Sequence, residues 1–456
     1  MPTYSTLRRI FGLGTALFAM LGCALLNPPA VIIPTPIPTA PPLNQALPLG
    51  SAEIITDPVS DIVPNIDPDI ETLVNAVSRQ QLMAYVQTLD SFGTRNSFSD
   101  TQRTDWGIGA ARLWIYNELV RVGQSSNGRM QVRYEDFPLT VGEFSAPQQN
   151  IIATLPGTTT PEDVIVIMAH YDTRPANAAD GTSRAPGAND NGSGVALLIE
   201  TARLLSARPW NQTIIFVALS SEEQGTFGAK NFVQNAILNN VNVIAAINYD
   251  TVGGNIGIPQ AIRLFAPDLT QSPSGELGRY YDYIGGLYVP AFPVNVENAM
   301  DREERWGDHR EFIFAGMPAV RLTQSYEDPS YINSTTDRWS EIDYDYLMQV
   351  TKVNVAVVAN MAGGPPRPQP PLITPMAGTD TLLLTWEVSP IAASYAISFR
   401  PLELPIYPTF RFVSASEAGN VALSGIDTSQ PYAVSIAAIT ATGRLGPFSP
   451  EIVMGR

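Results

Sequence analysis

The stretch VIMAHYDTRPANAADGTSRAPGANDNGSGVALLIE, residues 166–200, has an apolar run at each end and a polar loop between them. The first run ends at His170 and is of strand length, whereas the last run has helical spacing. The loop has few residues that could fill a core, but it holds one of the two histidines of the chain and three aspartates. A strand, a polar loop and a helix in this order predict one unit of an α/β fold whose loop carries chemistry.

Strand-like and helix-like segments alternate around this unit. Five short runs, most of them rich in Val and Ile, predict strands at residues 130–137, 149–157, 163–170, 212–223 and 241–250. Helical spacing is found at residues 70–92, 104–123, 192–207, 226–240 and 346–362. The alternation predicts an α/β domain over residues 70–362, in which helices cover both faces of a mostly parallel sheet in three layers.

The overall composition excludes several classes of protein. The chain has 456 residues, of which 45% are hydrophobic, so it can build a large core. Its 27 basic and 43 acidic residues give a net charge of −16, which argues against nucleic acid and against anionic membrane surfaces as partners. The single cysteine, Cys23, excludes an intrachain disulfide and a cysteine-ligated zinc.

Residues 1–26 have the layout of a secretory signal, because Arg8 and Arg9 precede an apolar stretch. The sequence MLGC at residues 20–23 resembles a bacterial lipoprotein box, whose cysteine is lipidated after cleavage. We therefore expect an exported protein, either secreted or periplasmic, or attached to the cell surface only through a lipid on Cys23. Ordinary signal cleavage and an uncleaved anchor stay open. The Pro-rich residues 27–69 are expected to form an extended spacer.

A second domain follows a Gly- and Pro-rich linker at residues 363–371. Short strand-like runs over residues 372–456 predict an all-β, immunoglobulin-like sandwich. With Trp386 in an early strand, Tyr395 in the next, and IDTSQPY and GPFSP further on, this region resembles a fibronectin type III domain. The resemblance implies a spacer or a module that binds a partner at the cell surface, and no chemistry.

Acidic residues follow the predicted strands of the first domain, and ligands bind at the carboxyl ends of strands in a parallel sheet. Several carboxylates in one place repel each other, and a divalent cation removes that cost. Histidine, aspartate and glutamate without cysteine fit zinc, or a similar ion such as cobalt or manganese. The residues concerned are His170, Asp172, Asp190, Glu222, Glu223 and Asp250.

The adjacent glutamates Glu222 and Glu223 suggest two different roles. Successive side chains at the end of a strand point to opposite sides, so both cannot bind one metal in the same way. One of them can bind metal while the other faces the open coordination position. There it can take a proton from a bound water and pass it to a leaving amine.

Four segments in this order and spacing resemble metallopeptidase family 28, the co-catalytic zinc aminopeptidases. They are AHYD at 169–172, GANDNGSGVA at 187–196, SSEEQGTFGA at 220–229 and NYDTVG at 248–253. The sequence GDHREFIFAGMPAVRL at 307–322 fits the next block of that family. The resemblance implies the three-layer fold of zinc aminopeptidases, also described as phosphorylase/hydrolase-like. It also implies an exopeptidase that removes N-terminal residues from peptides or proteins by attack of a metal-bound hydroxide.

Residue by residue, the resemblance implies two zinc ions per chain. His170 and Asp250 would bind the first zinc, Glu223 would bind the second, and Asp190 would bridge the two. Glu222 would be the general base and acid. Asp172 would orient His170, and a cis peptide bond would follow Asp190.

One position departs from the family pattern. In PSYINSTTDRWSEID, residues 329–343, Asn333 stands where the family has a further histidine ligand, four residues before Asp337. Three possibilities stay open. Asn333 binds metal through its oxygen; His309 or a water takes that place; or the second zinc binds weakly or not at all. We interpret Asp337 as the cap of a turn or helix rather than a ligand.

Two other functions remain as alternatives. A similar fold with a single metal serves glutaminyl cyclases, which transfer an acyl group within the substrate, and the missing histidine fits such an enzyme. Against the cyclase, the complete set of His170, Asp190 and Asp250 indicates that the first metal is present. The third interpretation is a non-catalytic surface protein on a decayed peptidase fold, against which the retained pair Glu222 and Glu223 argues.

Overall fold

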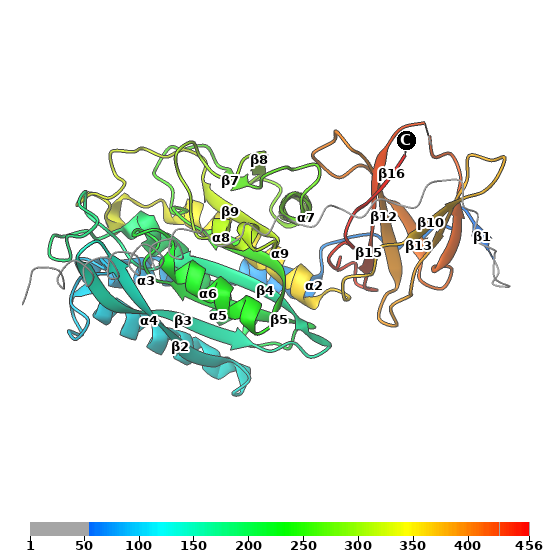
Figure 1. The fold of residues 1–456 in the computed structure, drawn as a ribbon. Helices are drawn as coiled ribbons and strands as arrows, with labels where there is room; N and C mark the ends of the chain where they lie inside the picture. The colour runs from blue at the N-terminus through cyan, green and yellow to red at the C-terminus, as the bar shows by residue number, and fades with distance from the viewer. Residues whose placement is uncertain (1–53, 428, 456) are drawn as a thin grey trace, which may run out of the picture.

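The computed structural model describes residues 54–427 and 429–455. The expected signal sequence, Cys23 and most of the expected spacer therefore lie outside the described residues. Figure 1 shows an α/β body and, beside it, a second body built of strands. Within the described residues, no helix combines the length and the apolar content that crossing a membrane requires.

An eight-stranded sheet forms the centre of the α/β body, in the order β2-β3-β5-β4-β6-β9-β7-β8. The four central strands β5, β4, β6 and β9 are parallel, whereas β2 and β3 are antiparallel additions at one edge. The prediction of a mixed α/β fold with a parallel centre is confirmed. The strands are β2 (Gln131–Val141), β3 (Phe144–Leu155), β4 (Thr160–His170), β5 (Gln212–Leu219), β6 (Asn242–Tyr249), β7 (Ile262–Phe265), β8 (Val294–Glu297) and β9 (Ala319–Gln324).

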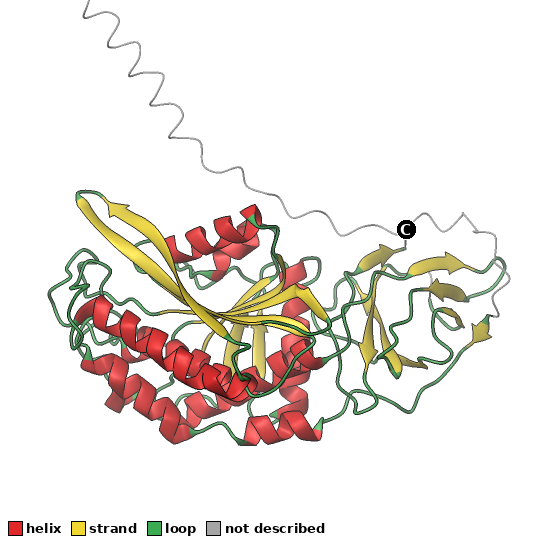
Figure 2. Ribbon diagram, turned by 90° about the horizontal axis from the view of Figure 1, so that it is seen from below, coloured by secondary structure: helices red, strands yellow, loops and turns green. Residues whose placement is uncertain are grey.

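Helices cover both faces of this sheet (Figure 2). Along β4, Ile165 and Ile167 join the core under α5 and α9, whereas Val166 and Met168 join the core under α6 and α8. Alternate side chains of a strand point to opposite faces, so β4 is apolar from Val164 to Ala169 because both of its faces are buried there. The helices are α2 (Pro68–Asn75), α3 (Arg79–Ser91), α4 (Gly107–Gly123), α5 (Gly194–Leu205), α6 (Phe227–Leu238), α7 (Pro273–Tyr288), α8 (His309–Phe314) and α9 (Tyr344–Gly363).

The helical pattern at residues 70–92 is divided into α2 and α3. Ser78 has extended backbone angles, and its side chain accepts a hydrogen bond from the Gln81 N–H at 3.2 Å. A serine that caps a helix in this way begins a new helix and changes the direction of the chain. The apolar periodicity of the sequence continues past Ser78, so the pattern alone did not reveal that α2 and α3 are separate helices.

The second body is all-β and consists of two four-stranded sheets, in the orders β1-β14-β11-β10 and β13-β12-β15-β16. Trp386 packs against Tyr395 in its core, with ring centroids 5.3 Å apart. The strands are β1 (Ile55–Thr56), β10 (Leu372–Pro375), β11 (Leu382–Thr385), β12 (Ser394–Pro401), β13 (Arg411–Ser414), β14 (Asn420–Leu423), β15 (Tyr432–Ile439) and β16 (Ile452–Met454).

The structure differs from the expected spacer in the part of residues 27–69 that it describes. Strand β1 pairs in parallel with β14, and the carboxylate of Asp57 accepts hydrogen bonds from the backbone and the side chain of Ser424 at 2.7 and 2.6 Å. The edge of β14 offers unpaired backbone groups, which an extended segment can satisfy. The segment before α2 is thus part of the second body.

A buried ion cluster fixes the second body to the α/β body. Glu451 accepts two hydrogen bonds from Arg400 at 2.8 and 2.7 Å, and it forms an ion pair with Arg279 of α7 at 2.9 Å. The side chains of all three residues are at most 1% exposed. The expected linker is also held, because Arg367 pairs with Glu276 of α7 at 3.1 Å. The two bodies therefore share a packed, charged interface.

We predict that Glu451→Ala lowers the thermal unfolding temperature, as measured by calorimetry. Removal of one partner from a buried ion pair costs about 3–5 kcal/mol, because it leaves an unpaired charge. Arg103→Ala is the matched control, since its pair with Asp105 is solvent-exposed, and it should leave the unfolding temperature almost unchanged. Equal unfolding temperatures for wild type and Glu451→Ala would contradict this account of the interface.

Candidate metal centre

The order of the strands brings the site residues together. Strands β5, β4 and β6 are neighbours in the sheet and run in parallel, so their carboxyl ends lie at one edge. His170 is the last residue of β4, Asp250 follows β6, and Glu222 follows β5 by three residues. Asp190 lies in the short turn η2 (Ala188–Ser193), directly before α5. The expected edge of the sheet thus carries the predicted residues.

Three side chains converge as a set of metal ligands. His170 Nε2 lies 3.3 Å from Asp190 Oδ1 and 3.5 Å from Asp250 Oδ1. One ligand atom from each residue lies within 4.8 Å of the others. Two carboxylates that face one imidazole in a buried place favour a bound cation, and this donor set suits zinc. The residues present therefore fit a zinc ion here.

An arginine fixes the second oxygen of Asp250. Arg321 Nη2 lies 3.0 Å from Asp250 Oδ2, and Arg321 also donates to Asp301 at 2.7 Å. Burial opposes ionisation of Asp250, but Arg321 and His170 together hold the pKa of its carboxyl well below the usual range. Asp250 is therefore ionised, with one oxygen left for a metal. The sequence analysis missed Arg321, although an arginine inside the apolar strand β9 is a visible signal.

Asp172 positions the two glutamates. Its carboxylate oxygens accept hydrogen bonds from the backbone N–H groups of Glu222 and Glu223, each at 3.1 Å. The expected contact with His170 is weaker: Asp172 Oδ1 lies 3.6 Å from His170 Nδ1, beyond hydrogen-bond distance, and the closer partner is the backbone oxygen of Asp172 at 3.1 Å. The side chain of Asp172 thus holds the turn that carries Glu222 and Glu223.

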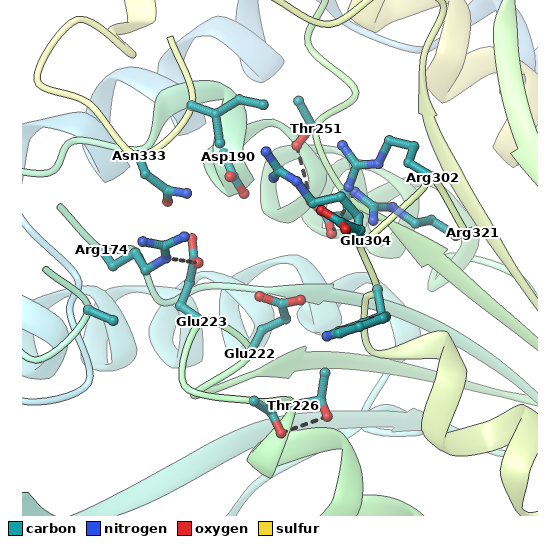
Figure 3. A pocket seen from close by; sticks show the side chains of 16 residues that line it. Arg174, Asp190, Glu222, Glu223, Thr226, Thr251, Arg302, Glu304, Arg321 and Asn333 are labelled. Atoms are coloured by element: carbon teal, nitrogen blue, oxygen red, sulfur yellow. Dashed lines mark hydrogen bonds and ion pairs between the residues drawn. The ribbon is translucent and has the colours of Figure 1, made fainter. Parts of the chain in front are cut away.

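Glu222 faces a cavity of about 230 Å³ that Asp190 and Asp250 also line (Figure 3). The side chain is half-buried. Burial raises the pKa of Glu222 well above its usual range. A carboxylate of raised basicity beside a set of metal ligands is suited to accept a proton.

Glu223 is engaged by two neighbouring side chains. Its Oε2 accepts a hydrogen bond from Arg174 Nε at 2.8 Å. With the amide oriented to satisfy both neighbours, Asn333 donates from Nδ2 to Glu223 Oε1 at 3.0 Å and accepts at Oδ1 from Arg174 Nη2 at 3.0 Å. Burial and the charge of Asp190 raise the pKa of Glu223 to about 8. As arranged, Glu223 and Asn333 do not fit a second zinc.

The structure does not bring His309 into the cluster. Its Nε2 lies 2.7 Å from the carbonyl oxygen of Met300. Burial lowers the pKa of His309 to about 4, so the ring is neutral. His309 is the first residue of α8, and its hydrogen bond to Met300 fixes the ring away from the ligand set.

Asp337 caps the turn that carries Asp190, as the sequence analysis interpreted it. Its carboxylate accepts hydrogen bonds from the backbone N–H groups of Asn189 and Asp190, at 2.7 and 2.9 Å. The peptide bond between Asp190 and Asn191 is cis, as the resemblance implied. These contacts place the Asp190 carboxylate opposite His170.

The chain is similar to known peptidases. Residues 150–358 match the model of peptidase family M28. A probable zinc metalloprotease of Leptosphaeria maculans is 32% identical over 397 residues, which cover 79% of this chain and 92% of that protein. A probable zinc metalloprotease of Pyricularia oryzae is 33% identical over 339 residues, which cover 66% of this chain and 68% of that protein.

Solved structures share the fold. The LapA aminopeptidase of Legionella pneumophila superposes with a TM-score of 0.52 at 18% identity, covering 65% of this chain and 76% of that one. The glutaminyl cyclase of Porphyromonas gingivalis gives a TM-score of 0.50 at 22% identity, covering 62% and 98%. At these identities the likeness concerns the fold alone.

We predict that Asp172→Ala weakens zinc binding about 10- to 100-fold, the usual loss when a residue that supports a metal site is removed. The physical reason is that the carboxylate of Asp172 holds its own segment in place by accepting from the backbone N–H groups of Glu222 and Glu223, and the backbone oxygen of Asp172 is the partner of the His170 ring. Competition with a chelator of known affinity measures the change. Asp180→Ala in the same loop is the control, and zinc affinity equal to wild type in Asp172→Ala would refute the assigned role.

Proposed function

The chain belongs to peptidase family M28 and is a zinc metallopeptidase, and from this premise we propose that it is an aminopeptidase that releases N-terminal residues from peptides. One observation carries the proposal: Glu222 lies beside the convergent set of His170, Asp190 and Asp250, at the wall of a single cavity. A proton acceptor next to a metal site is the arrangement that hydrolysis of an amide needs.

The chemistry divides between the ligands and Glu222. Zinc held by His170, Asp190 and Asp250 would supply a Lewis acid for the carbonyl oxygen and for water. Glu222 accepts a proton from the water whose oxygen forms the new bond to the carbonyl carbon. It then gives this proton to the nitrogen as the carbon–nitrogen bond breaks, so that a carboxylic acid and a free amine leave.

The size of the cavity supports an exopeptidase. About 230 Å³ is below the roughly 300–1,000 Å³ of common ligand pockets, so the cavity suits the end of a chain rather than a long segment. Its wall carries carboxylates, among them Asp190 and Glu222, and also arginines, among them Arg302 and Arg305, so the support comes from its size and not from its charge.

We predict that Glu222→Gln lowers kcat for aminoacyl amides about 10²- to 10⁴-fold, the contribution typical of general acid–base catalysis. The amide keeps the shape of the side chain but cannot take the proton. Steady-state kinetics measure the loss, and zinc content and unfolding temperature should match wild type. Glu303→Gln, an exposed neighbour of the cavity wall, serves as control. Undiminished turnover in Glu222→Gln would remove Glu222 from the reaction.

The glutaminyl cyclase alternative is separated by its products. A peptide that begins with glutamine gives free glutamine and a shortened peptide with an aminopeptidase, whereas a cyclase releases ammonia and keeps the peptide at full length. Mass spectrometry of the reaction distinguishes the two outcomes. We expect the shortened peptide. A cyclised peptide as the main product would contradict the aminopeptidase proposal and favour the cyclase.

We also propose that the protein is exported and carries a lipid on Cys23, on the basis of its N-terminal sequence. Expression with labelled palmitate tests the lipid. Wild type should take up the label and Cys23→Ser should not. An unlabelled wild type would contradict lipidation and would leave residues 1–26 as an ordinary secretory signal.

For the second body, the packing of Trp386 on Tyr395 between two sheets supports the fibronectin type III interpretation.

A further inference from the structure

Glu223 is held on both sides by protein groups. Arg174 donates to one carboxylate oxygen at 2.8 Å, and the amide of Asn333 reaches the other at 3.0 Å. Arg174 and Asn333 also bond to each other at 3.0 Å, so the three side chains close a ring of hydrogen bonds. Figure 3 shows Arg174 and Asn333 close to the carboxylate of Glu223, with Asp190 nearby. This is the place where the resemblance implies a second zinc.

Two features of this chain disfavour a second zinc. Arg174 lies beside Glu223, and Asn333 stands in place of a histidine. A guanidinium keeps its positive charge at all relevant pH values and binds carboxylate with a planar set of donors. A divalent ion on Glu223 would lie beside that fixed charge. The amide oxygen of Asn333 is a neutral donor, and Arg174 Nη2 already occupies it. Both the charge and the donors therefore disfavour a second ion.

The charges of the cavity wall also disfavour a second zinc. Five carboxylates line the cavity, together with four guanidinium groups; they belong to Asp190, Glu222, Glu223, Asp250 and Glu304, and to Arg174, Arg302, Arg305 and Arg321. Arg174 pairs with one of the carboxylates and Arg321 with another. Even with every carboxylate ionised, one divalent ion at His170 therefore exceeds the net negative charge of the cavity wall, and a second ion would enlarge the excess of positive charge.

We propose that Arg174 and Asn333 take the place of a second zinc, so that the enzyme works with one zinc, held by His170, Asp190 and Asp250. Asp190 is then a ligand of one ion and not a bridge. Arg174 and Asn333 are positioning residues, which fix Glu223 next to Glu222. The inference rests on the proposed function for the presence of the first zinc.

The test is zinc stoichiometry. Purified full-length protein is equilibrated with zinc, desalted and measured by elemental mass spectrometry, alongside Asn333→His and the double variant Arg174→Gln/Asn333→His. Asn333 has a positive φ of 56°, a conformation in which histidine is also found, so the backbone can accept the substitution. Arg305→Ala, another arginine of the cavity wall, is the matched control.

We expect one zinc per chain in wild type, in Asn333→His and in Arg305→Ala, and two in the double variant, where the charge is gone and the ligand is restored. Two zincs in wild type would overturn the inference while leaving the peptidase proposal intact. One zinc in a folded double variant would also overturn it, because Arg174 and Asn333 would then not be what excludes the ion. No zinc in wild type would instead defeat the proposed function. Circular dichroism checks the fold, and if the double variant does not fold, the wild-type value decides.

Discussion

Compensation of buried negative charge governs this site. The sheet order places the ends of β4, β5 and β6 side by side; β4 ends at His170, and the segments after β5 and β6 deliver carboxylates to the same small space. Such a group is stable only when positive charge is built in or bound. Arg321 supplies it to Asp250 and Arg174 supplies it to Glu223. Asp190 and the other oxygen of Asp250 face His170, and this is where a zinc ion would supply positive charge.

The supporting contacts explain why the geometry is held so closely. Asp172 fixes the turn with the two glutamates, and Asp337 fixes the turn with Asp190. Both are carboxylates that accept two backbone N–H groups, so neither is free to act as a ligand. On the far side of the α/β body, Glu451 and its two arginines fix the second body to α7. Carboxylates thus fix the turns of the site through hydrogen bonds, and they also hold the two bodies together through ion pairs.

Much of this was predictable from the sequence. Apolar runs of strand length followed by acids located the sheet and its active edge, and the order of four motifs located His170, Asp190, Glu222 and Asp250. The roles of Arg174 and Arg321 were not predictable in the same way, because the choice of ion-pair partner depends on which segments meet in space. The same holds for β1, since no local pattern indicates that residues 55–56 pair with β14.

Anomalous X-ray diffraction at the zinc edge, on crystals of the zinc-equilibrated protein, tests the central claim most directly. The account predicts one strong peak at about 2.0–2.2 Å from His170 Nε2 and from one oxygen each of Asp190 and Asp250. In that crystal, Arg174 would remain paired with Glu223. A peak between Asp190 and Glu223, or no peak at His170, would contradict the account.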